Sequence, residues 1–370
     1  MMRVVMSCGG TGGHIYPAIA IADKIREKHP DAEIMFIGTK KGMENTLVPA
    51  AGYEIKGIDA RGFDRKHLIE NFKTVHTFLQ GSNEVYGMLK RFKPDIVIGT
   101  GGYVTGPVLS MAHRQGIKCF IHEQNALPGV ANKFLSGFAE KVFTSFDGTQ
   151  NSFRHPDRVT VTGNPIRSGF LTKDRQECRE ALGVADNEKM VLLFGGSLGA
   201  EVLNREALGL IKQLAKENSS RIRLFFISGR RHYDEIKEKL DAMVGIPKFL
   251  TFLAYADNMP ELMCASDLVI SRAGAIAVSE IAACGRPSIL VPSPNVTDNH
   301  QFFNAKAVAD QGAAVLLEEM YLEEGKDVLA EEVLKLAADD EKLAAMAERS
   351  AATARTDAAD VIYENLGIDR

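Results

Sequence analysis

Residues 2–14 read MRVVMSCGGTGGH, and residues 190–200 read MVLLFGGSLGA. Each stretch is a short apolar run followed by clustered glycines and then by residues typical of a helix. A junction of this kind points backbone N–H groups and the positive end of a helix at an anion. Because one junction lies near the start of each half, the sequence predicts two nucleotide-type domains facing a cleft, with a phosphate-bearing molecule on each side.

The composition is that of an ordinary globular protein. The 370-residue chain is 45% hydrophobic and 25% charged, which provides enough apolar mass for two domains. No apolar run approaches the roughly 18 residues of a membrane span, and no signal peptide begins the chain, so we expect a cytoplasmic protein. The five cysteines lack metal-ligand spacing, which predicts reduced, buried thiols and no zinc site.

The charge is distributed unevenly along the chain. Residues 1–163 contain 20 Lys+Arg and 15 Asp+Glu, whereas residues 164–370 contain 24 and 33. A basic first half indicates an anionic partner there, but the absence of a Lys/Arg run argues against nucleic acid. The stretch 65–93 mixes basic and apolar residues, which suits an anionic membrane surface; the alternative is an amphipathic helix pair whose apolar face is core.

Apolar runs alternate with helical stretches in both halves, which predicts an α/β fold of parallel strands and crossover helices. The expected strands are 3–6, 33–37, 53–58, 96–100, 118–122, 141–144 and 158–162, then 190–194, 223–228, 249–252, 268–271, 288–291 and 314–316. Turn-forming residues meet at Gly163-Asn164-Pro165, so we expect one domain over 1–163 and a second over 164–345.

The glycine loops exclude two common nucleotide-binding classes. A P-loop ends in Gly-Lys-Ser/Thr, but the first loop ends in Gly-Gly-His. A dinucleotide site needs an acidic residue after the second strand, but the chain has GTKK at 38–41 and SGRR at 228–231. A third cluster at 99–107, GTGGYVTGP, gives the first half another N–H-rich turn that suits a diphosphate. The alternative is that all these glycines only permit tight turns.

Seven motifs follow one another in the order GGTGGH at 9–14, GGYV at 101–104, HEQN at 122–125, GNPIR at 163–167, GGSLGA at 195–200, RAGA at 272–275 with Ser279-Glu280, and DNHQ at 298–301. This ordered set resembles the MurG family of glycosyltransferases over about residues 2–310. The resemblance implies the GT-B fold of two Rossmann-like domains, with residues 346–370 packing back on the first domain. Leu198 and His300 depart from the family, in which glutamine is frequent at both positions.

The resemblance also implies a reaction. It implies inverting transfer of N-acetylglucosamine from UDP-N-acetylglucosamine (UDP-GlcNAc) to lipid I, a muramyl-pentapeptide on undecaprenyl diphosphate, giving lipid II for peptidoglycan. Because lipid I is anchored in the bilayer, we expect peripheral association with the inner face of the cell membrane. The alternatives are a diacylglycerol glucosyltransferase or a UDP-GlcNAc 2-epimerase of similar fold, and a bilobed sugar-binding protein without chemistry.

The second half is expected to bind the donor without a metal or cofactor. The chain contains no Asp-x-Asp motif for a metal on the diphosphate. The resemblance to the GT-B family implies that backbone amides and a helix dipole stabilise the departing UDP instead. The resemblance implies that Ser197 contacts the diphosphate, Glu280 the ribose hydroxyls and Ala256 the uracil. The other implied donor contacts are Ala275, Ile276, Ala277 and Gln301. Each of three residues has an alternative role without a ligand. Ser197 would cap a helix, Glu280 would interact favourably with the helix dipole, and Gln301 would be an exposed glutamine on a helix.

Direct displacement also needs a base for the acceptor hydroxyl. His14 is the first candidate, because imidazole titrates near neutral pH and this residue lies at the loop–helix junction; the alternative is that it braces the loop. Glu123 and Asn125 are alternative bases or orienting groups. The residues expected to contact sugar or phosphate in the first half are Thr11, Gly12, Gly13, Asn125 and Arg167. Arg167 has the alternative role of stabilising the domain boundary.

Overall fold

The computed structural model describes residues 1–370 except 61–70, 197, 218–220, 244–245, 323–325 and 369–370. The chain divides into two compact units. Unit 1 contains residues 1–167 and 355–370, and unit 2 contains residues 168–354. The chain therefore begins unit 1, builds unit 2, and returns to finish unit 1.

Both divisions come later in the chain than the expected boundaries after residues 163 and 345. Gly163 and Asn164 are held in unit 1, because Gly163 O accepts a hydrogen bond from His122 Nε2 and Asn164 Oδ1 accepts one from Ser145 Oγ. Helix α13 (Asp340–Thr353) runs unbroken through residue 345 and belongs to unit 2. The segment that returns to unit 1 therefore begins at Arg355.

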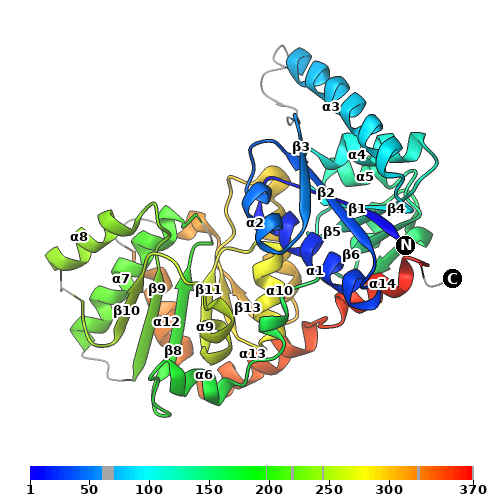
Figure 1. Ribbon diagram of the computed structural model, residues 1–370. Coiled ribbons are helices and arrows are strands. Elements are labelled where there is room, and N and C mark those ends of the chain that lie inside the picture. The colour runs from blue at the N-terminus through cyan, green and yellow to red at the C-terminus, as the bar shows by residue number, and fades with distance from the viewer. Residues whose placement is uncertain (61–70, 197, 218–220, 244–245, 323–325, 369–370) are drawn as a thin grey trace. The chain divides into compact units, whose positions relative to one another are not determined.

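Unit 1 is built on a parallel sheet in the order β3-β2-β1-β4-β5-β6-β7 (Figure 1). Its strands are β1 (Arg3–Cys8), β2 (Glu33–Thr39), β3 (Glu54–Ile58), β4 (Ile96–Gly101), β5 (Lys118–Glu123), β6 (Lys141–Thr144) and β7 (Val159–Val161). Its helices are α1 (Gly12–Lys28), α2 (Glu44–Ala50), α3 (Asn71–Phe92), α4 (Thr105–Arg114), α5 (Val130–Leu135) and α14 (Ala358–Asn365). Two apolar clusters, one on each face, bury the central strands β1 and β4, which explains their unbroken apolar runs.

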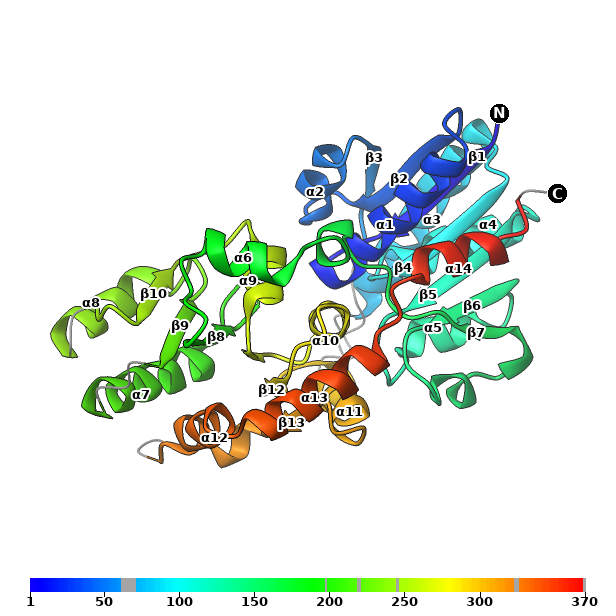
Figure 2. The same cartoon turned by 90° about the horizontal axis from the view of Figure 1, so that it is seen from below.

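Unit 2 repeats this plan with a parallel sheet in the order β10-β9-β8-β11-β12-β13 (Figure 2). Its strands are β8 (Lys189–Phe194), β9 (Ile222–Ile227), β10 (Leu250–Leu253), β11 (Leu268–Ser271), β12 (Ser288–Leu290) and β13 (Ala314–Leu316). Its helices are α6 (Arg175–Ala181), α7 (Glu201–Glu217), α8 (Tyr233–Met243), α9 (Met259–Ala265), α10 (Ala275–Ala283), α11 (His300–Ala309), α12 (Val328–Ala337) and α13.

The sequence prediction of the fold is confirmed. Every expected strand is present within two residues of its expected ends, and every strand pairing is parallel. All five cysteines are buried free thiols, as expected. Within the described residues, every helix is too short or too polar to cross a membrane.

Each sheet reverses its strand order once, between β1 and β4 in unit 1 and between β8 and β11 in unit 2. In open parallel sheets, ligands bind at the carboxyl ends of the strands beside such a reversal, because the connecting loops there lead away in opposite directions. Three glycine loops and the start of α10 directly follow these four strands. The topology thus brings the sequence motifs of each unit to one sheet edge.

Helix α14 completes the core of unit 1 by packing on α1 (Figure 2). Ile362 is fully buried in the apolar cluster that includes the α1 residues Ile21 and Ile25. Beside it, Tyr363 Oη lies 2.8 Å from His29 Nε2. The final helix is therefore part of the first domain's structure, although all of unit 2 precedes it in sequence.

Truncating the fully buried Ile362 side chain of α14 should destabilise unit 1. We expect Ile362→Ala to lower the free energy of unfolding by about 2–5 kcal/mol, because it removes buried methyl groups and leaves a cavity. Urea unfolding followed by circular dichroism measures this change. Glu364→Ala, on the exposed side of the same helix, is the control and should change the free energy by less than about 0.5 kcal/mol. Equal effects would contradict the docking of α14.

Candidate active site

The two glycine loops of unit 1 lie against each other. Gly102, with a φ of +88°, is so close to the backbone of Gly9 that a Cβ atom would collide with Gly9 O. Thr100 Oγ1 donates to His14 O at 2.7 Å and so ties the end of β4 to the start of α1. The loops predicted after β1 and β4 therefore form one continuous surface of backbone.

The first turn of α1 consists of Gly12, Gly13 and His14, preceded by Thr11. Thr11 is exposed, and its side chain makes no cap hydrogen bond to the helix. No acidic residue lies in the first turn. The helix start therefore presents backbone N–H groups that favour an anion, as the sequence predicted for this loop.

The imidazole of His14 has a defined orientation. Its Nδ1 lies 3.0 Å from Gly9 O. A carbonyl oxygen only accepts, so Nδ1 carries the hydrogen and the neutral ring has its lone pair on Nε2. The ring lies against Gly101, where φ is +115° and a Cβ atom would lie 2.7 Å from His14 Cδ2. These contacts fit the alternative in which His14 braces the loop, and its role as the base stays a prediction.

Glu123 lies at the carboxyl end of β5 and is buried. Its Oε1 accepts from Asn125 N at 2.9 Å and Asn125 Nδ2 at 3.2 Å. Its Oε2 accepts from Gly129 N at 3.0 Å and Asn132 Nδ2 at 2.8 Å. Four donors thus engage the carboxylate, which favours the orienting role over the role of base. Through Glu123, the side chain of Asn125 is fixed at the sheet edge.

His122 lies near the carboxyl end of β5 and is buried against Gly163, at the predicted domain boundary. Its Nε2 donates to Gly163 O at 3.1 Å, and its Nδ1 accepts from Gln124 Nε2 at 2.9 Å. Burial lowers the pKa of His122 to about 4, and the hydrogen bond to Gly163 offsets this only in part. The neutral ring joins the HEQN motif to the GNPIR motif.

Arg167 is the last residue of the first segment of unit 1. Its guanidinium carbon lies 5.0 Å from the ring centroid of Tyr16, on the second turn of α1. A Cβ atom at Gly12 would lie 3.1 Å from the same ring. Tyr16 thus connects Arg167 with the glycine loop by a cation–π contact, which the sequence did not reveal.

In unit 2, the second glycine loop packs on the end of β9. A Cβ atom at Gly199 would collide with Ser228 O, and one at Gly229 would lie 2.7 Å from Gly199 N. Leu198 is 75% exposed, so the position where the family often has glutamine points outward. Ser197 lies outside the described residues, and its role as a diphosphate ligand stays a prediction.

Ala256, the expected uracil contact, is buried in the segment after β10. Tyr255, next to it, is 40% exposed. The guanidinium carbon of Arg230, after β9, lies 4.5 Å from the centroid of the Tyr255 ring. The carboxyl ends of β9 and β10 therefore offer a flat aromatic and cationic surface beside the second glycine loop.

The start of α10 contains three of the expected donor contacts, Ala275, Ile276 and Ala277, directly after β11. Ala275 and Ile276 are buried. Glu280 is also buried and lies on the second turn of this helix, beyond the first turn where the helix dipole favours a carboxylate. The dipole therefore does not account for Glu280.

Gln301 lies in the first turn of α11, and its Oε1 accepts from Ser293 N at 2.9 Å. Because the oxygen faces this donor, the side-chain nitrogen faces the other way. Arg272 Nη1 donates to Glu319 Oε2 at 2.6 Å and to Val291 O at 3.2 Å. Arg272 thus ties together the ends of β11, β12 and β13 as a salt bridge at the strand ends.

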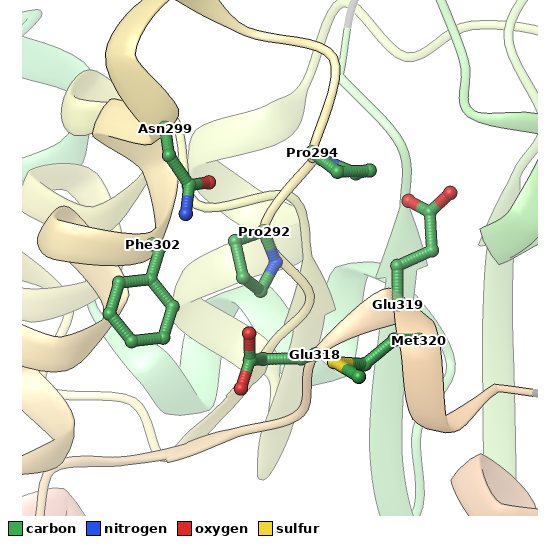
Figure 3. Close-up of a pocket in the computed structure, with 7 residues that line it drawn as sticks. All are labelled: Pro292, Pro294, Asn299, Phe302, Glu318, Glu319 and Met320. Atoms are coloured by element: carbon green, nitrogen blue, oxygen red, sulfur yellow. The ribbon is translucent and has the colours of Figure 1, made fainter.

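A hollow of about 320 Å³ lies at the carboxyl ends of β12 and β13 (Figure 3). Its lining residues are Pro292, Pro294, Asn299, Phe302, Glu318, Glu319 and Met320. Among the predicted donor contacts that the structure describes, none lines it, although Gln301 lies between two of its residues in sequence. Of the two carboxylates that line it, that of Glu319 is paired with Arg272. In the part of the chain that the structure describes, no group of three His, Cys, Asp or Glu side chains is arranged to hold a metal ion.

Comparisons with known proteins agree with this geometry. The family model described as Glycosyltransferase family 28 N-terminal domain matches residues 4–144, and the model described as Glycosyltransferase family 28 C-terminal domain matches residues 190–362. Fold and loops are thus those of a glycosyltransferase, and the expected GT-B fold is confirmed.

A protein of Acetivibrio thermocellus named UDP-N-acetylglucosamine–N-acetylmuramyl-(pentapeptide) pyrophosphoryl-undecaprenol N-acetylglucosamine transferase is 45% identical over 98% of this chain and 97% of its own length. The crystal structure of Acinetobacter baumannii MurG matches with a TM-score of 0.77 and 28% identity over 98% of this chain and 99% of that one. The chain belongs to the MurG family of glycosyltransferases. A solved UDP-N-acetylglucosamine 2-epimerase covers 99% of this chain and 95% of its own at a TM-score of 0.71, but at 14% identity it shares the fold alone.

The buried neutral His122 should make the stability of unit 1 depend on pH. The unfolded chain binds a proton at this histidine below about pH 6.5, whereas the folded protein binds it only near pH 4. Stability is therefore lost as the pH falls through this window, by roughly 2 kcal/mol between pH 7 and pH 5.

Urea unfolding of the wild type and of His122→Gln at both pH values measures this contribution. Because other groups titrate equally in both proteins, the difference between them isolates His122. The variant should lose less stability on acidification than the wild type. Parallel pH dependences would rule out a neutral buried His122.

Proposed function

We propose that this protein transfers N-acetylglucosamine from UDP-GlcNAc to the muramyl 4-hydroxyl of lipid I, giving lipid II and UDP. The observation that carries the proposal is 45% identity, over nearly the full length of both chains, to a transferase whose name states this donor residue and this acceptor. The amide-rich edges at both order reversals support it, because each substrate contains a diphosphate.

In the proposed reaction, His14 Nε2 takes the proton from the acceptor 4-hydroxyl. The oxygen attacks the anomeric carbon of the donor, the bond from that carbon to the β-phosphate oxygen breaks, and the configuration inverts. The electron pair leaves with UDP. Nδ1 of His14 lies 3.0 Å from Gly9 O and carries the hydrogen in the neutral ring, so Nε2 is the nitrogen with the lone pair that takes the proton.

We propose that unit 2 binds the donor. Glu280 accepts hydrogen bonds from the ribose hydroxyls, the backbone of Ala256 contacts uracil, and the loop around Ser197 contacts the diphosphate. The donor sugar is contacted by Gln301, whose amide nitrogen is turned away from Ser293. Backbone N–H groups at the second glycine loop and the start of α10 stabilise the negative charge on the departing UDP. Residues Ala275, Ile276 and Ala277 form the surrounding backbone.

We propose that unit 1 binds lipid I. The N–H groups at Thr11, Gly12 and Gly13 face the acceptor's sugar and diphosphate, as the positive end of α1 favours an anion. Asn125, fixed by Glu123, orients the acceptor. Arg167, stacked on Tyr16, provides a positive charge on the same side of α1.

Replacing His14 should reduce turnover much more than donor binding. We expect His14→Ala to lower kcat by about 10²–10⁴-fold with an unchanged Kd for UDP-GlcNAc, because only the transition state uses the base. Formation of lipid II from radiolabelled UDP-GlcNAc and a lipid I analogue gives kcat, and calorimetry gives Kd. His155→Ala, which changes the residue before the short turn Pro156–Arg158 that leads into β7, is the control and should keep the wild-type values.

The same assay separates the alternatives. Transfer of sugar to diacylglycerol, or epimerisation of UDP-GlcNAc with no acceptor present, would replace the proposed reaction with one of the other enzyme activities. Binding of UDP-GlcNAc without any turnover would favour a sugar-binding protein. Full activity of His14→Ala would leave the transferase in place and remove His14 as the base.

We further propose that the protein binds the inner face of the cell membrane peripherally through α3. In this helix, Phe78, Leu79 and Tyr86 are 37%, 57% and 38% exposed. Three exposed basic residues, Lys90, Arg91 and Lys93, follow at its end. Residues 65–70 of the predicted contact, and the side chains of 71–76, lie outside the described residues. Apolar side chains near basic ones suit an anionic lipid surface.

Binding to vesicles of anionic phospholipid should be strong at low salt and weak at high salt, because the basic residues contribute through screened electrostatics. We expect the double change Phe78→Ser and Leu79→Ser to reduce cosedimentation at least about fivefold. Tyr321→Ser, which changes a similarly exposed apolar side chain of unit 2, should not alter it. Binding that persists in the double variant would locate the membrane contact elsewhere.

A further inference from the structure

Glu44, the first residue of α2, is a fully buried carboxylate beside the first glycine loop. Its Oε1 accepts from Thr39 N at 2.9 Å and from Thr39 Oγ1 at 2.6 Å. Its Oε2 accepts from Gly10 N at 3.2 Å. Because an unpaired buried charge is very costly, these donors are what allow the carboxylate to lie there.

Three glycines enclose this carboxylate. A Cβ atom would lie 2.9 Å from Glu44 Oε1 at Gly9 and 2.7 Å from Glu44 Cγ at Gly38, and at Gly42 it would collide with Oε2. No side chain fits at these positions without moving Glu44. The glycines around the loop therefore make room for a buried acid as well as for a phosphate.

The carboxylate is ionised. Burial raises the pKa of Glu44, but hydrogen bonds from the Thr39 side chain, from its own backbone and from the backbones of Thr39 and Gly10 outweigh burial, and the net pKa is lowered. Burial and the charge of Glu44 raise the pKa of the neighbouring Cys8 thiol, so that thiol stays neutral. A fixed negative charge thus lies directly beneath the loop.

One peptide group connects Glu44 with His14. The N–H of Gly10 donates to Glu44, and the C=O of the same amide, that of Gly9, lies 3.0 Å from His14 Nδ1. Hydrogen bonds arranged in series through an amide polarise one another. The hydrogen bond from Gly10 N–H to the Glu44 carboxylate polarises this amide. It therefore makes the Gly9 oxygen a stronger acceptor for the Nδ1–H of His14.

We propose that Glu44 is a positioning residue that acts on His14 through the Gly9–Gly10 peptide, orienting the imidazole and stabilising the imidazolium formed during transfer. The proposal rests on the role of His14 as the base. In hydrolases with a Ser-His-Asp triad, a carboxylate bonds directly to the histidine that acts as the base. Here a peptide group lies between the carboxylate and the histidine. Both N–H hydrogens stay on their nitrogens, and the proton from the acceptor hydroxyl resides on His14 Nε2.

Glu44→Gln removes the charge and should uncouple the pair. We expect kcat for lipid II formation to fall about tenfold, a part of the 10²–10⁴-fold that a general base contributes, with an unchanged Kd for UDP-GlcNAc. The proton resonance of His14 Nδ1–H should move upfield, because its hydrogen bond to Gly9 O weakens. In the His14→Ala background, E44Q should leave the residual kcat unchanged, since the two residues act as one unit.

Asp23→Asn is the matched control, because it also converts a carboxylate to an amide in unit 1. Asp23 lies on α1 and accepts from Tyr53 Oη at 2.6 Å. We expect D23N to keep the wild-type kcat and the His14 resonance. Where E44Q does not fold, Glu44→Asp keeps the charge but withdraws it from Gly10 by one methylene, and the same direction of change is expected in kcat and in the resonance.

Two results would overturn the proposal. One is an unmoved His14 resonance in folded E44Q. The other is a fall in the residual turnover of His14→Ala by the same factor as in the wild type, which would show that Glu44 acts independently of His14. Full activity of His14→Ala would instead remove His14 as the base and, with it, the premise of the proposal. Failure of the positioning role and failure of the proposed base are thus distinguished.

Discussion

The reversal of strand order at the centre of each sheet is the constraint on which the candidate site depends. The chain leaves β1 and β4 in opposite directions in unit 1, and it does the same at β8 and β11 in unit 2. The loops at these carboxyl ends therefore lie where open parallel sheets bind ligands. Glycine lets neighbouring loops approach to backbone contact, as between Gly9 and Gly102. One architecture, used twice, thus suits a reaction between two diphosphate-bearing molecules.

Buried carboxylates determine which amides remain for a ligand. Glu44 engages the N–H of Gly10, and Glu123 engages the N–H groups of Asn125 and Gly129. Each of these acids shapes its loop by taking donors that would otherwise face an anion. The amides at the start of α1, which begins at Gly12, are not among the donors that these two acids engage. A glycine-rich sequence alone does not distinguish the amides used by the protein from those offered to a substrate.

The sequence was sufficient for the sheets and for the position of the motifs, because buried parallel strands are continuous apolar runs and glycine clusters mark the turns after them. The sequence did not predict that Glu44 is buried, because a glutamate at a helix start is usually exposed. The donors that hold its carboxylate come from β2 and the first glycine loop. For a similar reason, the observed domain boundaries lie later in the chain than the predicted ones. Only tertiary contacts show that Gly163 bonds to His122 and that α13 is one continuous helix.

Because α14 belongs to unit 1, unit 2 is an insertion within a domain whose two segments are far apart in sequence. During translation, the first segment emerges long before the helix that covers its apolar face, and all of unit 2 is made in between. Unit 2 is contiguous and has every segment it needs as soon as Ala354 is synthesised. Unit 2 is thus complete before unit 1, and the face of unit 1 that α14 covers stays open to solvent until the last helix is made. Apolar surface exposed in this way favours aggregation of the nascent chain.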